Sequence, residues 1–270
     1  MRFLCLHGRG TSSNILEAQL GKTHPRCGVV QPRRIRTDWS VPAPLRSRLH
    51  ARHTFDFVDG KGNCGAASGI SGSYPPPYLC WYELGSPGGV HAAQEYLRSI
   101  IDEDGPYDGV IGFSEGAALA VSLLLLDELS ATEPRFKVAI LFNSVAPLVP
   151  SVSQRLGASL AETVRGHEDV YLDLLLSKEQ KDSATEQEKS AILSQALCFS
   201  PKGLLRISMP TVHVIGNTDP FAGSSRVVVD LCTRDTAQVV LHDGGHEIPR
   251  DSAVLDRCAE LIETALLFAS

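Results

Sequence analysis

One serine stands between two glycines at the point where a β-branched run becomes a helix rich in alanine and leucine. The stretch is "VIGFSEGAALAVSLLLL", and Ser114 is the centre of its G-x-S-x-G motif. A serine in a sharp strand-to-helix turn is exposed for nucleophilic attack, provided that its neighbours leave room for the adjacent strand and helix. Gly112 and Gly116 supply that room, so the motif predicts a nucleophile at Ser114.

A serine hydroxyl needs a base to accept its proton and an acid to orient that base. "GNTDP" places Asp219 after one β-branched run, and "HDGGHEIP" places His246 after the next. The chain order serine, aspartate, histidine is that of α/β-hydrolases. We therefore expect Ser114 to be the nucleophile, Asp219 the acid and His246 the base. His242 and Asp243 are the nearest competitors, but His242 ends a strand and Asp243 lies too near the histidine loop to take the acid position.

A tetrahedral intermediate also needs donors for its oxyanion, usually two backbone N–H groups. One comes from the residue after the nucleophile, which is Glu115. The second is expected from Arg9 in "LHGRG", where Gly8 and Gly10 keep the loop close to the turn. The alternative for this loop is a plain strand-ending turn.

These residues need a scaffold, and the chain shows one in which short β-branched runs alternate with longer segments of helical period. The candidate strands are residues 2–6, 54–58, 108–111, 137–142, 211–215 and 238–241, and the candidate helices are about 89–104, 115–129, 224–233 and 252–268. We predict the α/β class and an α/β-hydrolase fold, with a compact, mostly parallel sheet of about six strands, helices on both faces and a helical lid insertion. A parallel sheet brings the three strand ends to one edge.

Two stretches interrupt the alternation within what we expect to be a single domain, residues 1–270. Residues 151–205 carry polar helical sequence and are interpreted as a probable lid, with a solvated helical excursion as the alternative. Residues 21–44 have no clear period and hold five basic residues against one acidic residue. Joining Leu20 to Ala43 would give a continuous helix, so 21–44 is interpreted as an atypical basic surface insertion, with a docking surface for an acidic partner as the alternative.

A glycine-rich stretch, "DGKGNCGAASGISG", precedes a cluster of aromatic residues and prolines, "SYPPPYLCWYEL". No P-loop lysine–serine pair or helix follows the glycines, so a flexible loop is favoured over a phosphate cradle. The aromatic cluster is interpreted as lying outside any strand. Tyr78 and Trp81 are candidates for substrate binding in an apolar acyl pocket, with ordinary loop packing as the alternative.

Charge and hydropathy argue against nucleic-acid and membrane partners. The formal net charge is −6 and the isoelectric point is near 5.8, so the bulk charge gives no support for phosphate-backbone binding. The longest apolar run, residues 117–126, is shorter than the roughly 20 residues that cross a bilayer. The N-terminal apolar stretch is interrupted too early for a secretion signal, so none is expected.

The cysteine and histidine patterns indicate neither disulfides nor metal. The seven cysteines include no C-x-x-C pair, which is typical of reduced thiols and favours a cytoplasmic location. Cys5 and Cys198 lack the context of a nucleophile and are interpreted as core thiols. The nine histidines show no spacing typical of zinc ligands, so no metal and no cofactor are expected.

The chain resembles the fungal serine hydrolase family, a compact α/β-hydrolase group. The matching pieces are "MRFLCLHGRGTSSNILEAQL", "HTFDFVDG", "GPYDGVIGFSEGAALA", "GNTDP" and "HDGGHEIPR", which together span nearly the whole chain. The resemblance implies the same roles for Ser114, Asp219 and His246. Glu115 stands where many relatives carry glutamine, which implies an added charge near the oxyanion hole and, with it, slower acylation or a different substrate.

Family members are associated with release of acyl or polyketide chains from carrier proteins and with hydrolysis of simple esters. We therefore expect a thioesterase of secondary metabolism. Its substrate would be an acyl or polyketide thioester, with the acyl carrier protein of a polyketide synthase as the partner. The alternatives are a carboxylesterase for small oxygen esters and a non-catalytic binding module on a hydrolase scaffold.

Overall fold

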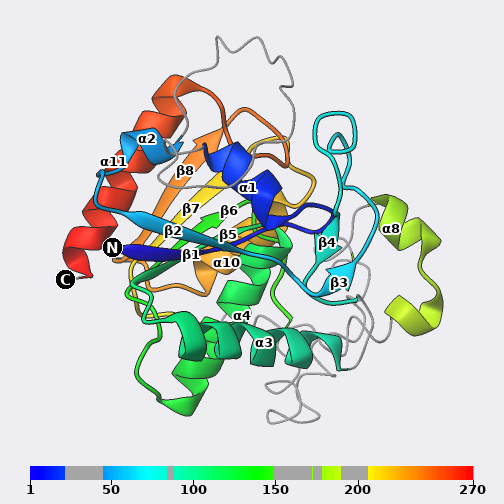
Figure 1. Ribbon diagram of the computed structural model, residues 1–270, viewed down its shortest axis with the longest axis horizontal. Helices are drawn as coiled ribbons and strands as arrows, with labels where there is room; N and C mark the ends of the chain where they lie inside the picture. The colour runs from blue at the N-terminus through cyan, green and yellow to red at the C-terminus, as the bar shows by residue number, and fades with distance from the viewer. Residues whose placement is uncertain (22–44, 84–87, 149–171, 173–177, 190–205, 270) are drawn as a thin grey trace.

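A six-stranded parallel sheet forms the centre of the molecule in the computed structural model, which describes residues 1–21, 45–83, 88–148, 172, 178–189 and 206–269 (Figure 1). Its strands lie in the order β2-β1-β5-β6-β7-β8, and every neighbouring pair is parallel. The strands are β1 (Arg2–Leu6), β2 (Thr54–Val58), β5 (Gly109–Phe113), β6 (Val138–Phe142), β7 (Thr211–Gly216) and β8 (Ala237–His242). The parallel sheet and the α/β-hydrolase class expected from the sequence are confirmed.

Helices cover both faces of this sheet, which is why its central strands are apolar on both sides. Within the described residues the helices are α1 (Ser13–Leu20), α2 (Leu45–Arg48), α3 (Gly89–Asp104), α4 (Glu115–Ser130), α10 (Ala222–Asp230) and α11 (Ser252–Phe268), with α8 (Lys178–Ser183) apart from the sheet (Figure 1). Alternate residues of β1 point to opposite faces: Leu4 and Leu6 pack with α3 and α4, whereas Phe3 and Cys5 pack with α1, α2 and α11. The strands β5, β6 and β7 are buried at every position.

A two-stranded hairpin stands beside the sheet, where the sequence predicted no strand. It pairs β3 (Gly62–Asn63) with β4 (Leu79–Cys80) in antiparallel register. The aromatic residues Tyr74, Tyr78, Trp81 and Tyr82 lie outside any strand as expected, but Leu79 and Cys80 between them form β4. Strands of two residues are too short to show an alternating pattern. The hairpin also reaches the loop after β1, because Thr11 forms an isolated bridge with Leu79.

The ends of helices α1 and α2 are tied together across the chain segment that separates them. The Arg46 guanidinium donates to the carbonyl oxygen of Gly21, and its Nη2 lies 3.4 Å from Glu17 Oε1. The same guanidinium stacks on the rings of Phe55 and Phe57. Residues 22–44 lie outside the described residues, as does most of the expected lid, so both interpretations stay predictions.

Candidate active site

Ser114 sits in the sharp turn that joins β5 to α4. Its φ of 54° and ψ of −116° lie in a region that side chains rarely adopt. The turn is possible because the residues two positions before and after Ser114 are glycines, which have no Cβ. A Cβ on Gly112 would overlap the backbone of Ala117, and one on Gly116 would overlap the carbonyl oxygen of Leu6. The local geometry is that of a nucleophile elbow.

The histidine and the aspartate chosen from the sequence reach Ser114 from the loops after β8 and β7. His246 Nε2 lies 2.8 Å from Ser114 Oγ, and His246 Nδ1 lies 2.9 Å from Asp219 Oδ2. The second oxygen of Asp219 accepts a hydrogen bond from the backbone N–H of Phe221, at 2.7 Å. In this arrangement the imidazole can take the hydroxyl proton while the carboxylate holds it in the required tautomer.

Two aromatic rings hold the imidazole of His246 in place. The centre of the Phe221 ring lies 5.0 Å from that of His246 in an edge-on contact, and the Phe113 ring lies 5.2 Å away. Phe113 is the last residue of β5 and Phe221 immediately precedes α10, so the rings approach from different elements. Both contacts are apolar and leave Asp219 to fix the direction of the imidazole N–H.

Asn143, which sequence reasoning missed, connects the acid loop with the histidine loop. Its Oδ1 accepts from the N–H of Gly216 at 2.9 Å, where the chain turns toward Asp219. Its Nδ2 donates to the carbonyl oxygens of Gly245 at 3.2 Å and Glu247 at 2.8 Å, the two neighbours of His246. Asn143 has a φ of 43°, which asparagine tolerates better than most residues.

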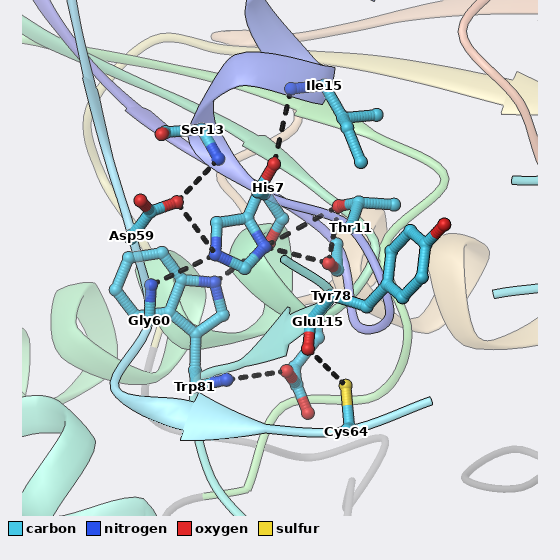
Figure 2. Close-up of polar contacts among 12 residues, drawn as sticks. His7, Thr11, Ser13, Ile15, Asp59, Gly60, Cys64, Tyr78, Trp81 and Glu115 are labelled. Atoms are coloured by element: carbon cyan, nitrogen blue, oxygen red, sulfur yellow. Dashed lines mark hydrogen bonds and ion pairs between the residues drawn. The ribbon is translucent and has the colours of Figure 1, made fainter. Parts of the chain in front are cut away.

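The loop after β1 contains a buried histidine that ties it to the chain just after β2 (Figure 2). His7 Nε2 accepts from the N–H of Gly60 at 2.9 Å, and His7 Nδ1 lies 2.8 Å from the carbonyl oxygen of Gly8. Burial lowers the pKa of His7, so the ring is neutral at neutral pH. A Cβ on Gly8 would come within 2.7 Å of the Phe113 ring and 3.2 Å of the Ser114 Cβ, so the loop approaches the nucleophile closely.

The side chains of the two expected oxyanion residues, Arg9 and Glu115, form an ion pair. Arg9 Nη2 lies 2.5 Å from Glu115 Oε1. Burial raises the pKa of Glu115, and the Arg9 guanidinium opposes that rise. The charge that the resemblance implied near the oxyanion hole is therefore balanced by a positive charge beside it.

The two candidate substrate-binding residues have different surroundings. Trp81 is only 5% exposed; its indole stacks on His7 with 5.1 Å between ring centres and donates to the His7 carbonyl oxygen at 2.8 Å. These are the contacts of a core residue. Tyr78 is partly exposed, and its hydroxyl donates to the carbonyl oxygen of Tyr74 at 2.8 Å. Contact with substrate stays a prediction for both.

The competitors weighed from the sequence make other contacts. Asp243 Oδ1 accepts from the Asn217 side chain at 3.3 Å, and His242 Nδ1 accepts from the N–H of Gly244 at 3.2 Å. Cys5 is buried in the core, where burial raises the pKa of its thiol. Cys198 lies outside the described residues.

Neither a metal centre nor a membrane span is found in the described ranges. No three histidine, cysteine, aspartate or glutamate side chains in this part of the chain are grouped so that they would hold a metal ion. None of the helices described has both the length and the apolar character needed to cross a bilayer.

Solved structures of hydrolases share this fold. A carboxylesterase from Mesorhizobium loti superposes with a TM-score of 0.52 at 14% identity, covering 98% of this chain and 88% of that one. ClbQ, from the colibactin NRPS/PKS pathway, superposes with a TM-score of 0.51 at 15% identity, covering 99% and 98%. At these identities the likeness concerns the fold.

Curated relatives from fungi align along most of their length with this chain. Esterase AlnB of Emericella nidulans is 27% identical over 290 residues, covering 93% of this chain and 91% of its own. Hydrolase FUB4 of Gibberella moniliformis is 26% identical over 284 residues, covering 97% of each. Esterase FPY3 of Fusarium mangiferae is 28% identical over 254 residues, covering 93% and 89%.

A model of the serine hydrolase (FSH1) family matches residues 1–258, which include the elbow, the acid loop and the histidine loop. This match spans nearly the whole chain and agrees with the resemblance seen in its motifs. The protein is an enzyme of the serine hydrolase (FSH1) family.

Proposed function

We propose that this serine hydrolase is a thioesterase that releases an acyl or polyketide chain from the phosphopantetheine arm of a carrier protein. The observation that carries hydrolysis is the continuous line of contacts from Ser114 through His246 to Asp219, at 2.8 Å and 2.9 Å. The choice of a thioester is supported by the resemblance of the motifs to a family associated with chain release. The apolar rings beside His246 suit an acyl substrate.

The reaction proceeds in two halves. Ser114 Oγ attacks the thioester carbonyl carbon while His246 takes the hydroxyl proton, and the backbone N–H groups of Arg9 and Glu115 bind the oxyanion. Collapse breaks the carbon–sulfur bond, and His246 returns the proton to the leaving thiolate. Water then attacks the acyl-enzyme with the same base, which gives a carboxylic acid and regenerates the serine.

A carboxylesterase that acts on small oxygen esters is the second candidate. It is favoured by the names of the relatives, because AlnB and FPY3 are both called esterases. The same triad serves both reactions, since they differ in the leaving group rather than in the attacking group.

Hydrolysis of a matched pair of substrates separates the two candidates. One acyl chain is presented as a pantetheine thioester and as an ethyl ester, to the wild type and to Ser114→Ala. A higher kcat/KM for the thioester that depends on Ser114 supports chain release. A higher value for the ethyl ester assigns the carboxylesterase instead.

A fluorophosphonate probe tests whether the serine is reactive at all. We expect it to label folded wild type at Ser114 and to leave Ser114→Ala unlabelled. If folded wild type is not labelled and cleaves neither substrate, the proposed function is wrong and the binding-module alternative takes its place.

A further inference from the structure

The two residues expected to donate backbone N–H groups to the oxyanion are joined through their side chains. Arg9 belongs to the loop after β1 and Glu115 is the first residue of α4, yet Arg9 Nη2 and Glu115 Oε1 are 2.5 Å apart. Their backbones come from segments more than a hundred residues apart in the sequence. An ion pair between the side chains therefore restricts how far the two backbone donors can separate.

A third segment, the chain just after β4, closes this arrangement. The N–H of Trp81 donates to Glu115 Oε2 at 2.8 Å, as Figure 2 shows, and the Arg9 guanidinium donates to the carbonyl oxygen of Tyr82. The Trp81 indole in turn donates to the carbonyl oxygen of His7, two residues before Arg9. Each of the three segments is thus bonded to the other two.

Burial makes the pair sensitive to the loss of either charge. The Glu115 side chain is 4% exposed and the Arg9 side chain 27% exposed. Removing one partner would leave the other as an uncompensated charge in a largely dry site, which costs far more than the pair itself contributes. The surviving charge would draw in water or shift the loop, and either change would move a donor by a fraction of an ångström.

We propose that Arg9 and Glu115 are positioning residues, whose ion pair sets the separation of the two oxyanion donors. This inference rests on the proposed function, because it assumes that the oxyanion of a serine-bound intermediate forms between these residues. Donors of this kind act on the transition state much more than on the bound substrate. The pair should therefore influence kcat and leave KM almost unchanged.

The chain offers a matched control at the other end of the same helix. Asp127, near the end of α4, pairs with Arg135, and their side chains are 7% and 27% exposed, nearly the values of the first pair. A variant of this second pair loses a comparable buried interaction far from Ser114. This control shows whether a fall in kcat comes from lower stability of the fold or from a changed separation of the oxyanion donors.

The experiment is a double-mutant cycle with Arg9→Met, Glu115→Gln and the double variant, beside Asp127→Asn. With p-nitrophenyl butyrate as the substrate, we expect each single variant to lower kcat about 10- to 100-fold and to change KM less than about threefold. The affinity for an alkyl trifluoromethyl ketone, which forms a tetrahedral adduct, should fall in parallel with kcat/KM. The double variant should be no worse than either single variant, and Asp127→Asn should keep kcat within about twofold.

Several outcomes would overturn the inference. Independent effects that multiply in the double variant would show that the two side chains do not act as a pair. Unchanged affinity for the trifluoromethyl ketone, or a change in KM alone, would show that they do not act on the oxyanion. If wild type itself is inactive and unlabelled by fluorophosphonate, the proposed function fails as well; activity in wild type with unchanged kcat in the variants removes only the positioning role.

Discussion

The two sides of Ser114 are fixed by different kinds of interaction. On the oxyanion side, a buried ion pair between Arg9 and Glu115 joins the loop after β1 to the elbow. On the base side, the Asp219 carboxylate orients His246, and the neutral amide of Asn143 and two phenylalanine rings support the histidine loop and its ring. A formal charge placed beside an imidazole changes how readily it takes a proton, whereas a buried charge needs its partner. We therefore expect kcat to fall most when a charge is added on the base side, and when a charge is removed on the oxyanion side.

The largest effect should come from the base itself. His246→Ala removes the proton acceptor, and by analogy with other serine triads we expect kcat to fall about 10⁶-fold. Asp219→Asn keeps the shape but favours the wrong imidazole tautomer, for an expected loss of about 10⁴-fold. Asp243→Asn is the control, because Asp243 contacts the Asn217 side chain. Activity of Asp219→Asn within tenfold of wild type would exclude Asp219 as the orienting acid.

A pair of substitutions at Asn143 tests whether the base side responds to charge. Glycine tolerates the φ of 43° and removes the three hydrogen bonds, whereas aspartate keeps the bond from Gly216 but turns an acceptor toward two carbonyl oxygens. We expect kcat to fall about 10-fold in Asn143→Gly and about 100-fold in Asn143→Asp at pH 7.5. Steady-state kinetics and thermal melts of both variants make the comparison. A more active aspartate variant would contradict the expectation that a further negative charge near His246 lowers kcat.

Gly8 tests how closely the oxyanion loop must approach the nucleophile. A Cβ in Gly8→Ala would meet the Phe113 ring at 2.7 Å, so the loop must shift and take the donor of Arg9 with it. We expect kcat to fall about 10-fold or more. Gly65→Ala is the matched control, since a Cβ at Gly65 meets nothing within 4 Å. Equal kcat values for Gly8→Ala and Gly65→Ala would show that the close approach of this loop to Ser114 is not needed for activity.

A second neutral histidine lies on the strand that leads to the acid loop. Burial lowers the pKa of His213 on β7 to about 4. The unfolded chain takes up a proton below about pH 6.5, which the folded chain refuses until about pH 4, so stability falls as the pH drops through this window. The expected loss is about 3 kcal/mol. Urea unfolding of His213→Leu at pH 7 and pH 4.5 should show a weaker pH dependence than wild type, and an equal dependence would contradict the assignment.

The smallest effect is expected from deleting residues 22–42, which lie outside the described residues. Because Arg46 already binds the carbonyl oxygen of Gly21, deletion of residues 22–42 should leave the ends of α1 and α2 together. If this stretch is a surface insertion, kcat should stay within about threefold of wild type. Lower solubility together with lower activity would favour a functional role for the stretch.

The sequence could predict that Ser114, His246 and Asp219 lie together, because each is marked by the local pattern at the end of a strand. Each of Ser114, Asp219 and His246 follows an apolar run, and a parallel sheet brings such ends to one edge. The bounds of β1, β2, α3 and α11 agree with the prediction, because each of these elements has a clear local pattern of apolar residues. The sequence predicts that the strand before Ser114 ends at Ile111, because Gly112 is interpreted as the beginning of the turn. In the structure β5 continues through Phe113.

What escaped prediction depends on contacts between distant residues. A single asparagine after β6 carries no periodic signal, although its position at a strand end beside the catalytic edge was a usable clue for Asn143. The partnership of Arg9 with Glu115 has no sequence signature, because opposite charges on separate segments meet only after the sheet has formed. The short strands β3 and β4 are stabilised by pairing with each other and with the loop after β1, not by their own residues.

The position of Trp81 makes it an optical reporter of the catalytic edge. Its indole stacks on His7, and its backbone N–H is bound by Glu115, so its emission depends on the packing of the loop after β1. The chain has two tryptophans, and replacing Trp39 with phenylalanine would leave a single fluorophore. Acyl-enzyme formation would then be followed in real time by stopped-flow fluorescence, without a label attached to enzyme or substrate.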